Sequence, residues 1–171
     1  MTTLRLDTPE GKNRPPAARG VTPAAGALAL ATPVATWWLV GDQSTVPARA
    51  GLDFAVRPWD ISPGTGQAAG IAALAAAAAA ALVIGRAARR HQFDGRWWSV
   101  LVPLLAAGTI AGAAWRVVTA GVIGANIGAG LAITFGGPLV VGLLAFAAAR
   151  GSYLLSRAHR SRTRAASARL R

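Results

Sequence analysis

The stretch WWSVLVPLLAAGTIAGAAW, residues 97–115, decides the fold class, because it contains no charged side chain. Trp98 and Trp115 are 17 residues apart, which corresponds to roughly 26 Å of α-helix at about 1.5 Å per residue. A helix of that length crosses the hydrocarbon core of a bilayer, which is roughly 30 Å thick. Tryptophan prefers the membrane–water interfaces. The stretch therefore predicts a transmembrane helix over residues 98–115.

Three further apolar stretches of similar length predict that the chain crosses a membrane four times. Of its 171 residues, 53% are hydrophobic and only 14% are charged, and a soluble domain does not normally carry several uncharged stretches this long. We expect an all-α fold, a polytopic transmembrane helical bundle within residues 24–149. Its predicted spans are residues 24–41, 67–85, 98–115 and 126–149.

The distribution of Lys and Arg predicts the orientation of these spans. The N-terminal tail, residues 1–23, has four basic residues and the loop 42–66 has two. The connection after the second span has four, the next connection has one, and the C-terminal tail, residues 150–171, has seven. Cytoplasmic segments of membrane proteins are rich in Lys and Arg. We therefore expect both termini in the cytoplasm, the loop 42–66 outside, and the cytoplasmic membrane as the location. The tail 1–23, rich in proline and charge, is expected to be disordered.

Two segments allow a second interpretation. The first span resembles a signal peptide, with Ala48-Arg49-Ala50 as a cleavage site, but the spans that follow it favour a retained helix. Residues 117–149 are uncharged and too long for one untilted span. The glycine-rich part, 117–130, is a loop, a re-entrant segment or the beginning of the fourth helix. We favour a helix that starts between Gly121 and Asn126.

Small residues predict where helices approach one another closely. They recur every four positions in a glycine stripe, Gly124, Gly128, Ala132 and Gly136. Such spacing places small side chains on one helix face, where another backbone can come near. The pair at positions 108 and 112 repeats this spacing in the third span, and the alanine-rich second span is expected to lie inside the bundle.

Residues with catalytic or metal-binding chemistry are scarce. The chain has no cysteine, and its two histidines, His91 and His159, lie in basic segments with no partner at catalytic spacing. The glycine-rich residues 64–70 follow no strand of a βαβ unit, so we interpret them as a turn rather than a nucleotide site. Pro138 follows two glycines and is expected to kink the fourth span. We therefore predict a protein that is not an enzyme and that has no metal or cofactor.

Charged groups outside the spans suggest two surfaces. The C-terminal arginines are expected to bind anionic lipid headgroups rather than nucleic acid; they are Arg150, Arg157, Arg160, Arg162 and Arg164. The external loop carries a cluster of opposite charges, which is either a structural tie or a surface that faces a partner or ligand. Its members are Asp42, Asp53, Arg57 and Asp60.

Three strings carry a resemblance to known proteins: WWLVGDQS at residues 37–44, RPWDISPGTGQ at 57–67 and GVIGANIGAG at 121–130. They resemble strings in small integral membrane proteins of actinobacteria that have no assigned function. The resemblance covers most of the membrane domain and implies no activity and no functional residue.

Two functions remain open from the sequence. The first is a non-enzymatic membrane protein that acts by association with itself, as a homo-oligomer, or with a larger membrane partner, because its spans combine small residues with an absence of ionisable groups. The second is a subunit of an oligomeric permease or channel for a small solute. A water-filled path lined by Asn126, Thr109, Thr119 or Thr134 would favour the second function.

The predicted topology can be tested with reporter fusions that distinguish cytoplasmic from external positions. Fusions after residues 20, 92 and 165 should report the cytoplasm, and fusions after residues 50 and 120 should report the outside, because the basic segments stay inside. An external C-terminal reporter, or a cytoplasmic reporter after residue 50, would contradict the orientation.

Overall fold

The computed structural model describes residues 17–42, 55–121 and 126–168, and these residues form helices and no strands. A 3-10 turn, Gly95–Trp97, precedes α3, and a π-helical segment, Ala132–Gly136, joins α4 to α5. Four stretches are long and apolar enough to cross a membrane, which confirms the predicted all-α fold with four candidate spans. The α-helices are α1 (Ala17–Val40), α2 (Pro63–Arg89), α3 (Trp98–Val118), α4 (Asn126–Leu131) and α5 (Gly137–Ala168). The candidate spans are Gly20–Val40, Pro63–Arg89, Gly95–Val118 and Ile127–Arg157.

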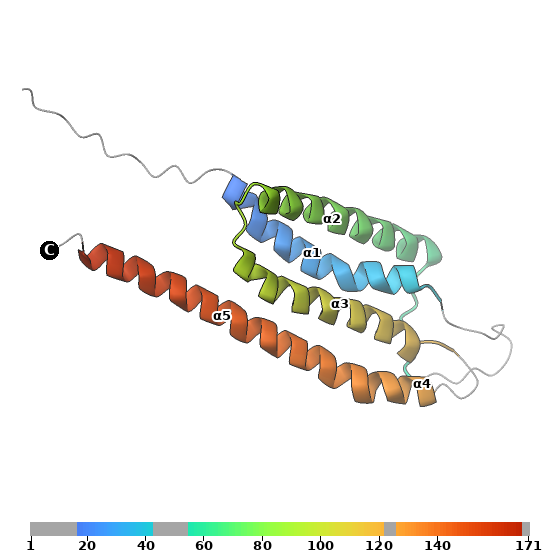
Figure 1. Cartoon of the computed structure of the whole chain (residues 1–171). Helices are drawn as coiled ribbons and strands as arrows, with labels where there is room; N and C mark the ends of the chain where they lie inside the picture. The colour runs from blue at the N-terminus through green and yellow to red at the C-terminus, as the bar shows by residue number, and fades with distance from the viewer. Residues whose placement is uncertain (1–16, 43–54, 122–125, 169–171) are drawn as a thin grey trace, which may run out of the picture.

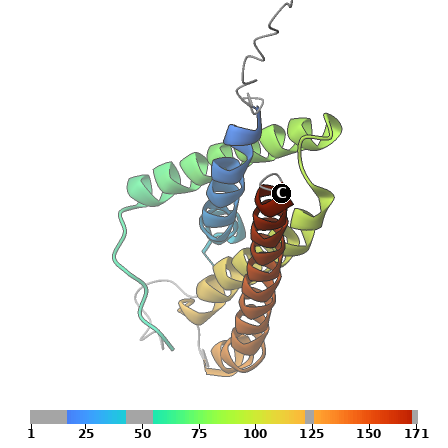
Figure 2. The same cartoon turned by 90° about the vertical axis from the view of Figure 1, so that its left-hand side faces the viewer.

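The four long helices lie side by side in the order α2, α1, α3, α5, as Figure 1 shows. Helix α1 packs against both α2 and α3, and α3 packs against both α1 and α5. The helices α2 and α5 are the edges of this row, and Figure 2 shows α2 lying across α1 at one edge. The helices of the predicted bundle are arranged as an open row. Helix α1 begins and α5 ends at the same end of the row (Figure 1).

Close backbone packing joins α1 to α3. A Cβ atom built on Gly112 would overlap the backbone carbonyl of Pro33, and one built on Gly108 would lie 3.1 Å from the Cδ atom of Pro33. Pro33 has no N–H, which weakens the helical ladder of α1, and the hydroxyl of Thr32 donates a hydrogen bond of 2.7 Å to the carbonyl of Leu28. The glycines at 108 and 112 therefore form a backbone contact within the chain.

Helix α2 packs on α1 through one narrow face. Its more buried residues repeat at alternating intervals of three and four, the spacing of a coiled-coil seam. At one end of this seam the indole of Trp38 covers Gly70, where a Cβ atom would overlap the ring. The prediction that α2 lies inside a bundle was wrong: among the described elements α2 packs extensively against α1 alone, because one face of small residues suffices for close approach. The seam consists of Gly70, Ala73, Ala77, Ala80, Ile84 and Ala87.

Both α1 and α2 begin earlier than the sequence patterns indicated. Ser62 caps α2, since its Oγ atom accepts a hydrogen bond from the backbone N–H of Thr65 at 3.3 Å, and Pro63 occupies the first helical position, where a missing N–H costs little. Residues 64–70, interpreted from the sequence as a turn, are therefore the first turns of α2. Helix α1 begins at Ala17, inside the predicted disordered tail, and residues 1–16 lie outside the described part of the chain.

The fourth candidate span contains a change of helical type. Helix α4 starts at Asn126, within the predicted interval, while residues 122–125 lie outside the described residues. The π-helical segment ends immediately before Gly137 and Pro138. Because proline lacks an N–H and its ring crowds the preceding turn, it disfavours a regular α-helical ladder at this point. Helix α5 then continues to Ala168, beyond the predicted end of the span.

The contact between Gly112 and Pro33 predicts a large cost for a single methyl group. Gly112→Ala should lower the free energy of unfolding by about 1–3 kcal/mol, because the helices must move apart. Gly142→Ala is the matched control, since a Cβ atom at Gly142 meets nothing within 4 Å and alanine favours the helix. The measurement is unfolding of both variants in the same detergent. Equal stability of the two variants would contradict the close contact.

Candidate functional site

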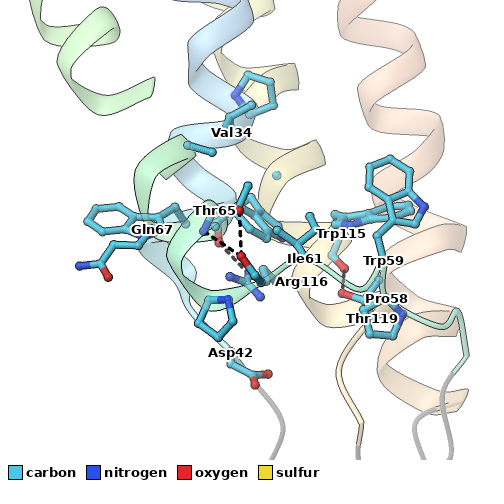
Figure 3. A pocket seen from close by; sticks show the side chains of 18 of the residues that line it. Val34, Asp42, Pro58, Trp59, Ile61, Thr65, Gln67, Trp115, Arg116 and Thr119 are labelled. Carbon is cyan, nitrogen blue, oxygen red and sulfur yellow. Dashed lines mark hydrogen bonds between the residues drawn. The ribbon is translucent and has the colours of Figure 1, made fainter. Parts of the chain in front are cut away.

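A pocket of about 1030 Å³ lies at one end of the row, where α1 ends, α2 begins and α3 ends. Residues 58–62, which connect toward α2, form a further wall (Figure 3). The volume lies at the upper end of the range typical of small-molecule sites, roughly 300–1,000 Å³. The lining therefore combines residues from both sides of α1, which are distant in sequence and meet because α1 occupies the middle of the row.

Four tryptophans line the pocket: Trp37 and Trp38 from α1, Trp59 from the connecting segment, and Trp115 from α3. The ring centroids of Trp59 and Trp115 are 5.6 Å apart, with the rings tilted by 50°, a separation at which aromatic rings attract one another. Trp59 remains 74% exposed, so the pocket is open beside it. Apolar rings with polar N–H groups are typical of the membrane interface.

Arg116, in the last turn of α3, is the basic side chain among the pocket-lining residues. Its Nε atom donates a hydrogen bond of 2.8 Å to the carbonyl of Trp37, and its guanidinium lies 4.1 Å from the centre of the Trp37 ring. That carbonyl belongs to the last turn of α1, where carbonyls lack a helical partner and the helix dipole is negative. Arg116 therefore caps α1 from the neighbouring helix.

The terminal nitrogens of Arg116 retain their capacity to donate. A guanidinium has five N–H donors, and within the described residues Arg116 makes one hydrogen bond, through Nε. Arg116 is half-buried and lines the pocket. The bond to α1 therefore holds the guanidinium of Arg116 at the pocket. Its Nη groups have no hydrogen-bond partner within the described residues.

Hydrogen bonds also fix the segments around the pocket. The backbone N–H of Val56 donates to the carbonyl of Val118 at 3.4 Å, which joins the connecting segment to the end of α3. The hydroxyl of Thr119 donates to the carbonyl of Trp115 at 2.7 Å. The hydroxyls of Ser62 and Thr65 are 2.8 Å apart and share one hydrogen bond, so the hydroxyl that accepts this bond keeps a hydrogen to donate.

The pocket combines apolar rings with a few polar groups. The polar groups are the guanidinium of Arg116, the amide of Gln67, the hydroxyls of Ser62, Thr65 and Thr119, and the carboxylate of Asp42, which has an interaction of its own. Among the described residues there is no group of three His, Cys, Asp or Glu side chains that could hold a metal ion. An apolar pocket with a few oriented polar groups selects a ligand by shape and charge.

The structure places the glycine stripe beside α3. A Cβ atom built on Gly128 would lie 3.5 Å from Val117, and one on Gly136 would lie 3.9 Å from Ile110, both ordinary contacts. Ala132 is half-buried, and Gly124 lies outside the described residues. Because residues 132–136 are π-helical, the four positions do not follow one α-helical line. Their role as a helix contact surface stays a prediction.

The C-terminal arginines lie on α5, at the end of the row opposite the pocket. The guanidinium groups of Arg150 and Arg157 lie 5.9 Å and 5.2 Å from the centre of the Tyr153 ring, and Arg160 is exposed. The side chains of Arg162 and Arg164 lie outside the described residues, although α5 includes both positions. Their binding to lipid headgroups stays a prediction.

The sequence patterns did not identify the pocket. Of its residues, Trp115 is predicted as an interface marker of the third span, and Arg116 enters only as the one basic residue of the third connection. The available signal was the side of the membrane that the sequence predicts for these residues: Trp37 and the Trp115-Arg116 pair fall at external ends of spans, and Trp59 lies in the external loop. The expected charge cluster in the same loop contributes Asp42 to the pocket lining, while Asp53 lies outside the described residues.

Comparison with known proteins found no family model, curated protein or solved structure that matches this chain. The fold therefore defines the class: an all-helical chain with four candidate membrane spans.

Arg116 should stabilise the fold through the end of α1. Arg116→Gln removes the hydrogen bond to Trp37 and the stacking on its ring, so we expect a loss of about 1–3 kcal/mol in the free energy of unfolding. Arg86→Gln removes the same charge from an exposed position on α2 and should change the stability little. Thermal unfolding in detergent measures both. Similar midpoints for the two variants would contradict the capping role.

Proposed function

We propose that this chain is a non-enzymatic integral protein of the cytoplasmic membrane that acts by association with a second copy or with a larger membrane partner. The observation that carries this proposal is the position of α2 at the edge of an open row. Among the described elements, α1 is the helix against which α2 packs extensively, and many residues on the side of α2 away from α1 are exposed.

The uncovered side of α2 has the pattern of a second packing seam. Ile71, Ala75, Ala78 and Leu82 follow the same alternating spacing as the inner seam, and all four are exposed. Two alanines in the middle of this outer seam offer a shallow surface that a neighbouring helix can approach closely. Lipid tails supply little drive for helix association, so the shape of this seam supports packing against another helix.

The orientation proposed from charge agrees with the arrangement of the helices. Helix α1 begins and α5 ends at the same end of the row (Figure 1), which supports placing both termini on one side. The described arginines of α5 and those of the connection after α2 lie at that end. We place this end in the cytoplasm, where the basic tail binds anionic headgroups.

A permease or channel subunit is the second candidate function. The pocket at the end of the row opposite the arginines of α5 favours it. Two of the hydroxyls that the sequence suggested for a water path are bonded within their own helix: Thr109 to Leu105 at 2.9 Å and Thr119 to Trp115 at 2.7 Å. Thr134 is exposed, and the side chain of Asn126 lies outside the described residues. An open row encloses no path by itself, so association is the better supported function.

Photo-crosslinking in native membranes tests the association. The chain contains no cysteine, so a single cysteine can carry a benzophenone maleimide at one position. Ala78→Cys, on the outer seam, should give a protein adduct of defined mass, because a neighbouring helix lies against that seam. Val102→Cys, on α3 and 54% exposed, is the control and should give lipid adducts. If Ala78→Cys also gives only lipid adducts, the outer seam has no partner.

A further inference from the structure

The pocket at the ends of α1, α2 and α3 holds donors and apolar surface that the fold does not use. Capping of α1 uses Nε of Arg116, and its terminal nitrogens have no partner within the described residues. One hydroxyl of the Ser62 and Thr65 pair keeps a hydrogen to donate. The positive end of the α2 dipole also faces this site, since Pro63 and Thr65 line it.

These donors have the chemistry of a phosphate site. A guanidinium matches the oxygens of a phosphate group with two parallel N–H donors, and such charge-assisted hydrogen bonds are among the strongest in proteins. The positive end of a helix dipole favours the same charge. Arg116 is already oriented by its bond to Trp37 and by stacking on that ring, so little side-chain entropy remains to be lost when an anion binds.

The apolar walls and the position of the pocket identify the rest of the ligand. Four tryptophans line the pocket; Trp115 lies in the last turn of the candidate span Gly95–Val118, and Trp59 lies just before the candidate span Pro63–Arg89. Tryptophan rings at the ends of spans are typical of the membrane interface. At that depth a bilayer presents a phosphate with acyl chains directly beneath it. A free anion in water would not use the apolar walls, and a fully apolar ligand would leave the donors of Arg116 unpaired.

We propose that this pocket binds one phospholipid from the leaflet at this end of the helices, with its phosphate on Arg116 and the beginning of its acyl chains against the tryptophans. The lipid completes the hydrogen bonds of a guanidinium that the protein holds at the interface. The proposal is independent of the association through α2, because none of the four residues of the outer seam lines the pocket.

Two pairs of variants separate the site from general attraction between a basic protein and anionic lipid. Arg116→Gln removes one positive charge at the pocket, and Arg86→Gln removes one at the opposite end. Ala69→Phe places a ring at a position that lines the pocket and leaves Arg116 in place. Ala68→Phe places the same ring on the neighbouring residue, which is exposed and does not line the pocket.

Native mass spectrometry of the full chain in mild detergent measures the affinity for the first bound lipid. The probes are dioleoylphosphatidylglycerol, dioleoylglycerol, which has the same chains without phosphate, and inorganic phosphate. We expect the wild-type chain and the Arg86→Gln and Ala68→Phe variants to bind the phospholipid equally. Arg116→Gln should bind it at least about tenfold more weakly, and Ala69→Phe should show a loss of similar size.

Three results would overturn the proposal. Equal affinity for dioleoylglycerol would show that the phosphate is not recognised. Inorganic phosphate that displaces the lipid at equal concentration would show that the apolar walls contribute nothing. If Ala69→Phe binds as tightly as Ala68→Phe, the lipid lies elsewhere on the protein, and this result does not depend on whether Arg116→Gln folds normally.

Discussion

The row of helices depends on the direct contact between the backbone of α1 at Pro33 and that of α3 at Gly112. In a bilayer, burial of apolar surface offers little drive for two helices to associate, so the helices must be held by close packing. Gly108 and Gly112 allow that packing because they have no side chain to separate the two backbones. On the other side of α1, Gly70 performs the same role beneath the ring of Trp38.

These two contacts also create the pocket. Because α2 and α3 approach α1 from opposite sides, the end of α1 carries the two adjacent tryptophans between them. Arg116 then joins the fold to the site, since one of its N–H groups caps α1 while its terminal nitrogens have no hydrogen-bond partner within the described residues. The same residue stabilises the end of a helix and supplies the positive charge among the residues that line the pocket.

An open row is a physically reasonable arrangement for a membrane protein but would be costly for a soluble one. In water, exposed apolar faces on α2 and α5 would be a large unfavourable surface. In a bilayer they contact acyl chains at little cost, so the chain needs no closed interior. The uncovered faces are therefore available to partners. Because helices and lipid chains are both apolar there, the shape of a face decides whether a helix or lipid packs against it. The small alanines at the centre of the outer seam of α2 leave a shallow surface against which another helix can pack.

The sequence by itself determined the helical class and the four candidate spans. The reason is that a span requires only a long uncharged apolar stretch whose backbone hydrogen bonds are made within the helix, and both properties are local in sequence. The tertiary structure alone decided which glycines are in close contact, that α2 lies at an edge, and that Trp37, Trp59 and Arg116 meet. Spacing in sequence shows which residues share a face of a helix. Which helix packs against that face depends on the order of the helices in the row. That order is set by contacts such as that of Gly112 with Pro33, between residues distant in the chain.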